Sequence, residues 1–156
     1  MHLGRLAIGG CGIVFGEETA VEPDGRKTHN CAGLYKQSHV ASYRKITDMI
    51  KSNGALPAIQ LGHSGRKGSC HDAMKDWRAL NKSDAANGLP PWQVITPTSA
   101  VSPPRPIPHK EMDQDDINRV IDDFRTATKR SIDAGYEIVE IHGAHGYLIH
   151  QFLSAT

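Results

Sequence analysis

Short strand-like patterns alternate with helix-like patterns along this chain, and this alternation restricts its fold more than any other feature. Compact apolar runs at 12–17, 56–61 and 136–142 predict strands, whereas residues 38–54 and 113–135 carry apolar side chains at helical spacing. The resulting order is strand, helix, strand, long loop, helix, strand. Because successive parallel strands need a crossover that a helix usually supplies, we predict an α/β fold with helices packed on a parallel sheet.

Capping residues indicate where the two helices begin and end. Ser38 is the expected N-cap of the first helix, and Gly54 suits the position just after its last turn. Asp113 is the expected cap of the second helix, with Asp116 in its first turn and Gly135 after its end. One face of this second helix is apolar, formed by Ile117, Val120, Ile121, Phe124, Ala127 and Ile132.

The segment between the second strand and the second helix, residues 62–112, has no periodicity and is rich in Gly, Pro, Ser, Asn and charge. A structureless stretch of this length inside a compact domain is usually functional or disordered. We predict a long loop here, within a single domain spanning 1–156, a length that one hydrophobic core can serve. Its strand–helix units are expected at about 12–54, 56–135 and 136–156.

Alternation alone does not separate a doubly wound sheet from a (β/α) barrel. Gln60, Glu140 and His142 fall on one face near the ends of their strands, and the aliphatic residues fall on the other. Polar residues that point inward at strand ends favour the barrel. A full barrel needs ~250 residues, so we predict a partial TIM (β/α)8 barrel of about three to four β/α units.

Composition excludes several classes of function. The chain has 18 Lys and Arg against 17 Asp and Glu, with no block of like charge, so we expect no nucleic-acid partner. No apolar run reaches the ~18 residues that span a membrane, and the start does not resemble a signal peptide. The three cysteines lack metal-ligand or redox spacing and fit reduced thiols. We expect a cytoplasmic protein that acts on a small molecule.

Three groups that can hydrogen-bond or exchange a proton lie at the end of the third strand. His142 ends the strand, and His145 and Tyr147 follow within six residues, spaced by glycines. Parallel α/β folds bind ligands at this end of their strands, where a His pair can polarise a carbonyl and a tyrosine can donate a proton. By residue type alone, a core histidine, a helix cap and a packing tyrosine are equally good interpretations. A metal site is not expected, because no third ligand is evident.

A second polar segment begins at Gln60, which precedes a glycine-rich turn with His63, Arg66 and Lys67. Glutamine presents a donor and an acceptor together, which suits the edge of a heterocycle with imide and amide character. Arg66 or Lys67 would instead suit a phosphate, and a solvated loop is the third interpretation. No G-x-G-x-x-G follows the first strand, which weakens a Rossmann assignment.

Three segments taken together, residues 17–26, 59–67 and 140–154, resemble the old yellow enzyme family, and most of all its bacterial NADH:flavin oxidoreductases. The resemblance implies an FMN-bound (β/α)8 barrel. Such an enzyme takes hydride from NADH or NADPH onto the flavin and passes it to an activated alkene, its small-molecule substrate.

The resemblance also implies roles for individual residues. Gln60 would contact the pyrimidine edge of the flavin. His142 and His145 would be catalytic groups that bind the substrate oxygen and stabilise enolate charge, as an oxyanion hole does. Tyr147 would be the catalytic proton donor, and Lys67 would lie near the flavin or bind the substrate.

Two departures from the family pattern change the expected function. Glu18 stands at a cofactor-contacting position where the family usually has a small residue, and its carboxylate is expected to crowd and repel the reduced flavin. The chain is also about half of a full barrel, which predicts a truncated enzyme of low activity. The alternative is an inactive fragment that binds a partner protein or small ligand without flavin. Unpaired strand edges would favour a homo-oligomer or a complementing barrel fragment.

Overall fold

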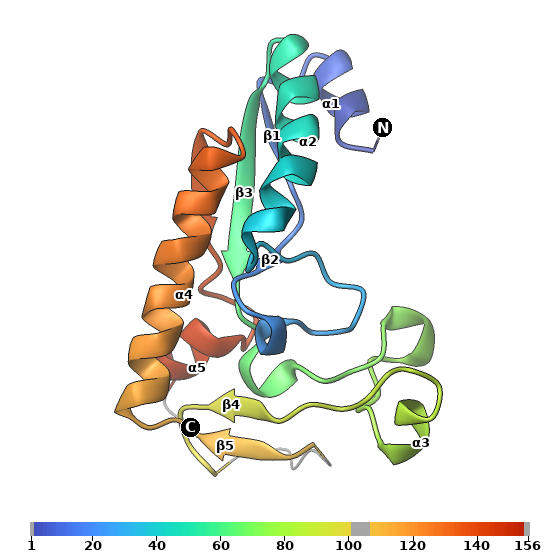
Figure 1. The fold of residues 1–156 in the computed structure, drawn as a ribbon, viewed down its shortest axis with the longest axis vertical. Helices are drawn as coiled ribbons and strands as arrows, with labels where there is room; N and C mark the ends of the chain where they lie inside the picture. Colours follow the sequence, from blue (N-terminus) through green and yellow to red (C-terminus); the bar gives the residue numbers. More distant parts are fainter. Residues whose placement is uncertain (1, 101–106, 155–156) are drawn as a thin grey trace.

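The computed structural model describes residues 2–100 and 107–154, so Met1, 101–106 and 155–156 of the predicted domain lie outside it. Its central element is strand β3 (Leu56–Gly62), labelled in Figure 1. In the described residues, each of its pairings is parallel.

The neighbours of β3 are β1 (Ile13–Phe15), β2 (Thr19–Ala20) and β6 (Ile138–Ile141). β1 pairs with the start of β3 and β2 with its end, while β6 pairs with its middle. Ala58 and Leu61 each pair with β6 as well as with β1 or β2. Because one strand edge takes one partner at each position, β6 must lie on the opposite edge from β1 and β2. The predicted parallel sheet is therefore confirmed.

Helices α2 (Val40–Ser52) and α4 (Gln114–Asp133) cover one face of this sheet, as Figure 1 shows. Ile59 and Leu61 of β3 are fully buried there in a cluster with Val40 of α2 and Ala127 of α4. This burial confirms that the aliphatic residues of the second predicted strand face the helices. The opposite face carries exposed apolar side chains along β1 and at the start of β3, namely Ile13, Phe15 and Leu56.

The predicted start of α2 is wrong by one residue, whereas its predicted end is confirmed. Ser38 lies inside the 3-10 turn η2 (Gln37–His39), and α2 begins after it, with His39 as N-cap and no side-chain capping bond. The 3-10 turn leads directly into α2, so Ser38 lies within the turn and its hydroxyl does not cap the helix. Gly54 follows the helix with φ of 80°, a conformation that glycine adopts most readily.

α4 begins where the sequence predicts. Asp113 accepts a hydrogen bond from the Asp116 N–H, and the Asp116 carboxylate accepts one from the Asp113 N–H, which completes a capping box. The predicted apolar face is wrong at Ile121 and Ile132, which are 52% and 63% exposed. Val120 is buried in place of Ile121, and Ser131 and Ala134 are buried in place of Ile132.

Residues 62–112, predicted to be a loop without regular structure, contain several short elements in their described part. β4 and β5 pair in parallel, and α3 starts with a capping box between Asn81 and Asp84. The prediction was wrong because pieces of three or four residues are too short to show a periodicity. The elements are η3 (Gly65–Lys67), η4 (Ala73–Lys75), α3 (Lys82–Ala85), β4 (Val94–Thr96) and β5 (His109–Glu111).

Three further elements have no counterpart in the sequence prediction: α1 (Gly4–Ile8), β2 and η1 (Pro23–Gly25). The last helix, α5 (Leu148–Leu153), falls within the predicted strand–helix unit 136–156. α1 contributes Ala7 to a second small cluster of buried apolar residues. α5 begins directly after Tyr147, so the loop that follows β6 runs straight into a helix. Among the described residues, no helix combines the length and the apolarity that crossing a membrane requires.

The packing of β3 against the helices makes Ile59 a sensitive position. We expect Ile59→Val to lower the free energy of unfolding by about 1 kcal/mol, because it removes one buried methylene and leaves a small cavity. Ile132→Val is the matched control, since the same deletion at a 63% exposed side chain should change stability far less. Urea denaturation of the two variants checks this, and equal losses would contradict the assignment of Ile59 to the core.

Candidate functional site

The candidate site lies where β3 and β6 end. Gln60 and Glu140 are register partners, and the Gln60 amide donates a hydrogen bond to the Glu140 carboxylate. One step further, the His142 N–H donates to the Leu61 carbonyl at 2.8 Å. These bonds place His142 beside the end of β3 and confirm that Gln60 and Glu140 share a face.

The loop after β6 brings the three predicted catalytic groups together. His142 is buried, and its Nδ1 accepts a hydrogen bond from the Ala144 N–H at 3.2 Å. Its Nε2 lies 3.2 Å from Nδ1 of His145, so a neutral His142 carries its proton on Nε2 and donates it to His145. The Tyr147 ring is centred 4.9 Å from the His142 ring. Left-handed backbone at His145 and Gly146, with φ of 58° and 70°, folds the loop back on itself.

The electrostatic surroundings favour the neutral form of His142. Burial lowers its pKa below the ordinary value of histidine, the negative charge of Glu18 acts in the opposite direction, and nearby His145 lowers it further. At neutral pH the imidazole therefore offers an uncharged N–H. A neutral donor of this kind can bind an oxygen on which negative charge develops.

Two lysines flank the Tyr147 ring. Lys67, from η3, donates a hydrogen bond to the His145 carbonyl at 2.6 Å, and its Nζ lies 5.6 Å from the centre of the ring. The Nζ of Lys27 lies 5.1 Å from the same centre. A Cβ at Gly146 would come within 3.1 Å of the Lys67 Nζ, so the glycine leaves room for this ammonium group.

Glu18 forms a partly buried ion pair with Lys27. Its carboxylate binds Lys27 at 2.6 Å, and its side chain is 9% exposed. A Cβ at position 62 would fall 2.2 Å from Oε1 of Glu18, so the carboxylate occupies the space that Gly62 leaves open. The same Oε1 is buried and has no hydrogen-bond partner among the described residues. The positive charge of Lys27 opposes the predicted repulsion between Glu18 and a reduced flavin. Lys27 was not among the predicted site residues, because its partner is nine residues away on an irregular segment.

His63 was one of the three potentially cationic groups of the glycine-rich turn, and the structure gives it an internal partner. Its Nε2 lies 2.7 Å from Glu22, and its Nδ1 accepts a hydrogen bond from the Gly65 N–H. Burial raises the pKa of Glu22, but His63 and Arg119 outweigh it and leave the pKa below its ordinary value. The buried network ties the end of β3 to α4, so His63 is not available to a ligand.

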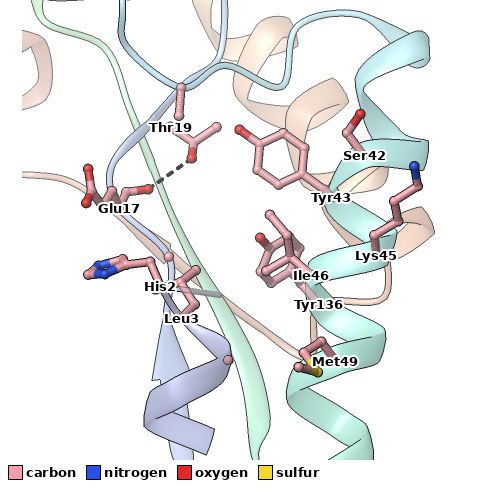
Figure 2. A pocket seen from close by; sticks show the side chains of 13 residues that line it. His2, Leu3, Glu17, Thr19, Ser42, Tyr43, Lys45, Ile46, Met49 and Tyr136 are labelled. Atoms are coloured by element: carbon pink, nitrogen blue, oxygen red, sulfur yellow. Dashed lines mark hydrogen bonds between the residues drawn. The ribbon is translucent and has the colours of Figure 1, made fainter.

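A larger cavity lies away from these groups, between α2 and the segment that joins β1 to β2. Its volume is about 630 Å³, and Figure 2 shows Tyr43 and Ile46 of α2 opposite Glu17 and Thr19. Within the segment that forms one wall of this cavity, the Thr19 hydroxyl donates a hydrogen bond to the Glu17 carbonyl. None of the predicted site residues lines it, and its titratable groups do not form a cluster that suggests chemistry. We therefore place the candidate site at the strand ends.

No group of three or more His, Cys, Asp or Glu in the described residues is arranged to hold a metal ion.

Comparison with known proteins identifies relatives that are oxidoreductases by name. A model of the NADH:flavin oxidoreductase / NADH oxidase family matches residues 2–156. The chain is 37% identical to an NADH:flavin oxidoreductase of Gibberella zeae, over 98% of this chain and 37% of that protein. It is 32% identical to an NADPH dehydrogenase of Bacillus subtilis, over 98% of this chain and 39% of that protein. The chain thus spans well under half the length of these relatives.

Solved structures show the same relationship. A 2-naphthoyl-CoA reductase in complex with 2-naphthoyl-CoA superposes with a TM-score of 0.78 at 28% identity, over 97% of this chain and 22% of that one. An old yellow enzyme from a Pichia species gives 0.75 at 23% identity, over 99% and 40%. The second likeness establishes the fold, which is part of a (β/α) barrel as predicted.

The contacts of His142 predict how its pKa responds to substitution. Glu18→Gln removes the anion that raises the pKa and leaves the charge of Lys27 unbalanced, so we expect the pKa of His142 to fall further. An NMR titration of the His142 ring protons measures it. Glu137→Gln is the control, because Glu137 pairs with Lys51 on the surface. An unchanged or higher pKa in Glu18→Gln would show that the carboxylate does not act on His142.

Proposed function

The chain belongs to the NADH:flavin oxidoreductase / NADH oxidase family, that of the old yellow enzymes, and from this premise we propose that it forms the substrate-binding and proton-donating part of an ene-reductase. Membership implies FMN as the cofactor and NADH or NADPH as the reductant. The proposed substrate is an alkene activated by a neighbouring carbonyl or similar group. The observation that carries the proposal is the convergence of His142, His145 and Tyr147 at the end of β6.

The residues at the strand ends fit a flavin. Gln60 offers an amide donor and acceptor, and Oε1 of Glu18 is a buried acceptor that lacks a donor. The pyrimidine edge of a flavin carries an N–H between two carbonyl oxygens, which complements both side chains. Lys27 balances the charge of Glu18 at 2.6 Å, which reduces the repulsion expected from the sequence. We assign Gln60 and Glu18 to the cofactor side of the site.

FMN, when bound, supplies hydride chemistry that no amino-acid side chain provides. The histidines bind and orient the substrate. His142 presents its Nε2–H, which a substrate oxygen can take over from His145, and the two rings then stabilise the enolate charge.

Tyr147 holds the proton that completes the reduction. Its hydroxyl donates this proton to the carbon next to the carbonyl, while the hydride enters at the other alkene carbon. The ammonium groups of Lys27 and Lys67 lie beside the ring and offset the negative charge left on the phenolic oxygen. We do not favour the flavin-free alternative, because it would leave the buried acceptor of Glu18 without a function.

Flavin binding is the first test. The purified chain, incubated with FMN and freed of excess, should retain a visible flavin absorption, because Gln60 and Glu18 offer matched hydrogen-bonding groups. A Gln60→Leu variant should retain less, since it removes both the donor and the acceptor at the proposed edge. A chain that remains colourless after reconstitution would exclude the ene-reductase proposal for these residues acting alone.

The proton-donor role of Tyr147 is tested by separating the two half-reactions. In the FMN-loaded protein, Tyr147→Phe should slow alkene reduction by roughly a hundredfold or more, as loss of a general acid does, and spare flavin reduction by NAD(P)H. Stopped-flow absorbance follows both steps. Tyr43→Phe is the control, because the Tyr43 ring packs against the core cluster and its hydroxyl donates to the Gly33 carbonyl. Equal losses in both half-reactions would contradict the role.

A further inference from the structure

Beside Tyr147, the structure has a small cavity to which the proposed reaction assigns no part of the substrate. Its volume is about 310 Å³, and it is lined by Lys27, Lys67, Cys70, Trp77 and Tyr147. The space suits a group of the size of a substituted benzene ring rather than a dinucleotide. Because Tyr147 also contacts His142, a molecule in this cavity is next to the proposed catalytic groups.

The charges around this cavity do not cancel. Lys27 is matched by Glu18, whereas no acidic side chain in the described residues forms an ion pair with Lys67. Lys67 donates instead to a neutral carbonyl, that of His145, and so keeps its full charge. Glu18 binds one of the two ammonium groups that line the cavity, and no described carboxylate binds the other, so the cavity has a net positive charge that favours an anion.

Trp77 gives the cavity an aromatic wall. The indole is half-exposed, and Asp76 and Trp77 both have left-handed backbone, with φ of 52° and 53°. Two consecutive non-glycine residues in this region are strained, and such strain is typical of segments that position a group for function. A planar ligand could stack on this indole while its charged end lies near the lysines.

We propose that Lys27 and Lys67 form a carboxylate subsite beside Tyr147, and that the enzyme prefers unsaturated carbonyl compounds bearing a separate carboxylate on a planar frame. The inference rests on the proposed function, because it assigns the substrate oxygen to His142 and His145 and the carboxylate to the lysines. It adds a class of substrate that neither the family nor the names of the relatives specify.

Two probes of equal shape and different charge test the subsite: 4-hydroxybenzoate and 4-hydroxybenzamide. Calorimetric titration of the full chain, with and without FMN, should show at least tenfold tighter binding of the carboxylate at low salt. Lys67→Gln and Lys27→Gln should each reduce this preference to less than threefold, and Lys67→Arg should preserve it. Lys129→Gln is the matched control, since it removes an exposed lysine of α4 and should leave the preference unchanged.

Glu18→Gln tests the subsite through a gain, rather than a loss, of carboxylate binding. It leaves the charge of Lys27 without a partner, so carboxylate binding should strengthen severalfold while amide binding stays the same. The subsite would be overturned if the two probes bound with equal affinity, or if Lys129→Gln reduced the carboxylate preference as much as the site variants do. Tighter binding of inorganic phosphate than of 4-hydroxybenzoate would overturn it as well. A chain that prefers the carboxylate but retains no FMN refutes the proposed function alone, whereas an FMN-loaded chain without the preference refutes only the subsite.

Discussion

The parallel pairing of β3 with β6 is the interaction on which the rest of the structure depends. It aligns Gln60 with Glu140 and lets the Leu61 carbonyl accept the N–H of His142. Side chains alternate along a strand, so a slip of one residue would turn the polar groups toward the helices and the aliphatic ones away from them. The burial of Ile59 and Leu61 therefore fixes the position of the site as well as the core.

Two loops meet above these strand ends, and each holds the other in place. Lys67, after β3, binds the carbonyl of His145, and the His63 carbonyl accepts the N–H of Leu148 at the start of α5. The left-handed backbone at His145 is strained for a residue with a side chain, and these bonds stabilise it. This backbone conformation positions the His145 imidazole against His142. The hydrogen bonds between the two loops therefore help to maintain the geometry of the two histidines.

Periodic features of the sequence predict much of this arrangement. Alternation along 56–61 and 136–142 identifies two of the paired strands and the face that Gln60 shares with Glu140, and the capping box at Asp113 fixes the start of α4. The missed features have no period. The Glu18–Lys27 pair joins two irregular positions, and the partner of His63 comes from a separate loop, so only tertiary contact reveals either.

The Glu18–Lys27 pair connects the proposed cofactor side of the candidate site to its proposed substrate side. A buried carboxylate oxygen without a donor costs free energy, which a protein tolerates when a ligand supplies the missing hydrogen bond. The other oxygen, Oε2, binds Lys27 beside Tyr147. A hydrogen bond from a ligand to Oε1 would withdraw negative charge from the carboxylate and weaken this ion pair. The positive potential at the Tyr147 hydroxyl would then increase. Occupation of the flavin side would thereby strengthen the attraction of an anion on the other side, which couples the two through a single side chain.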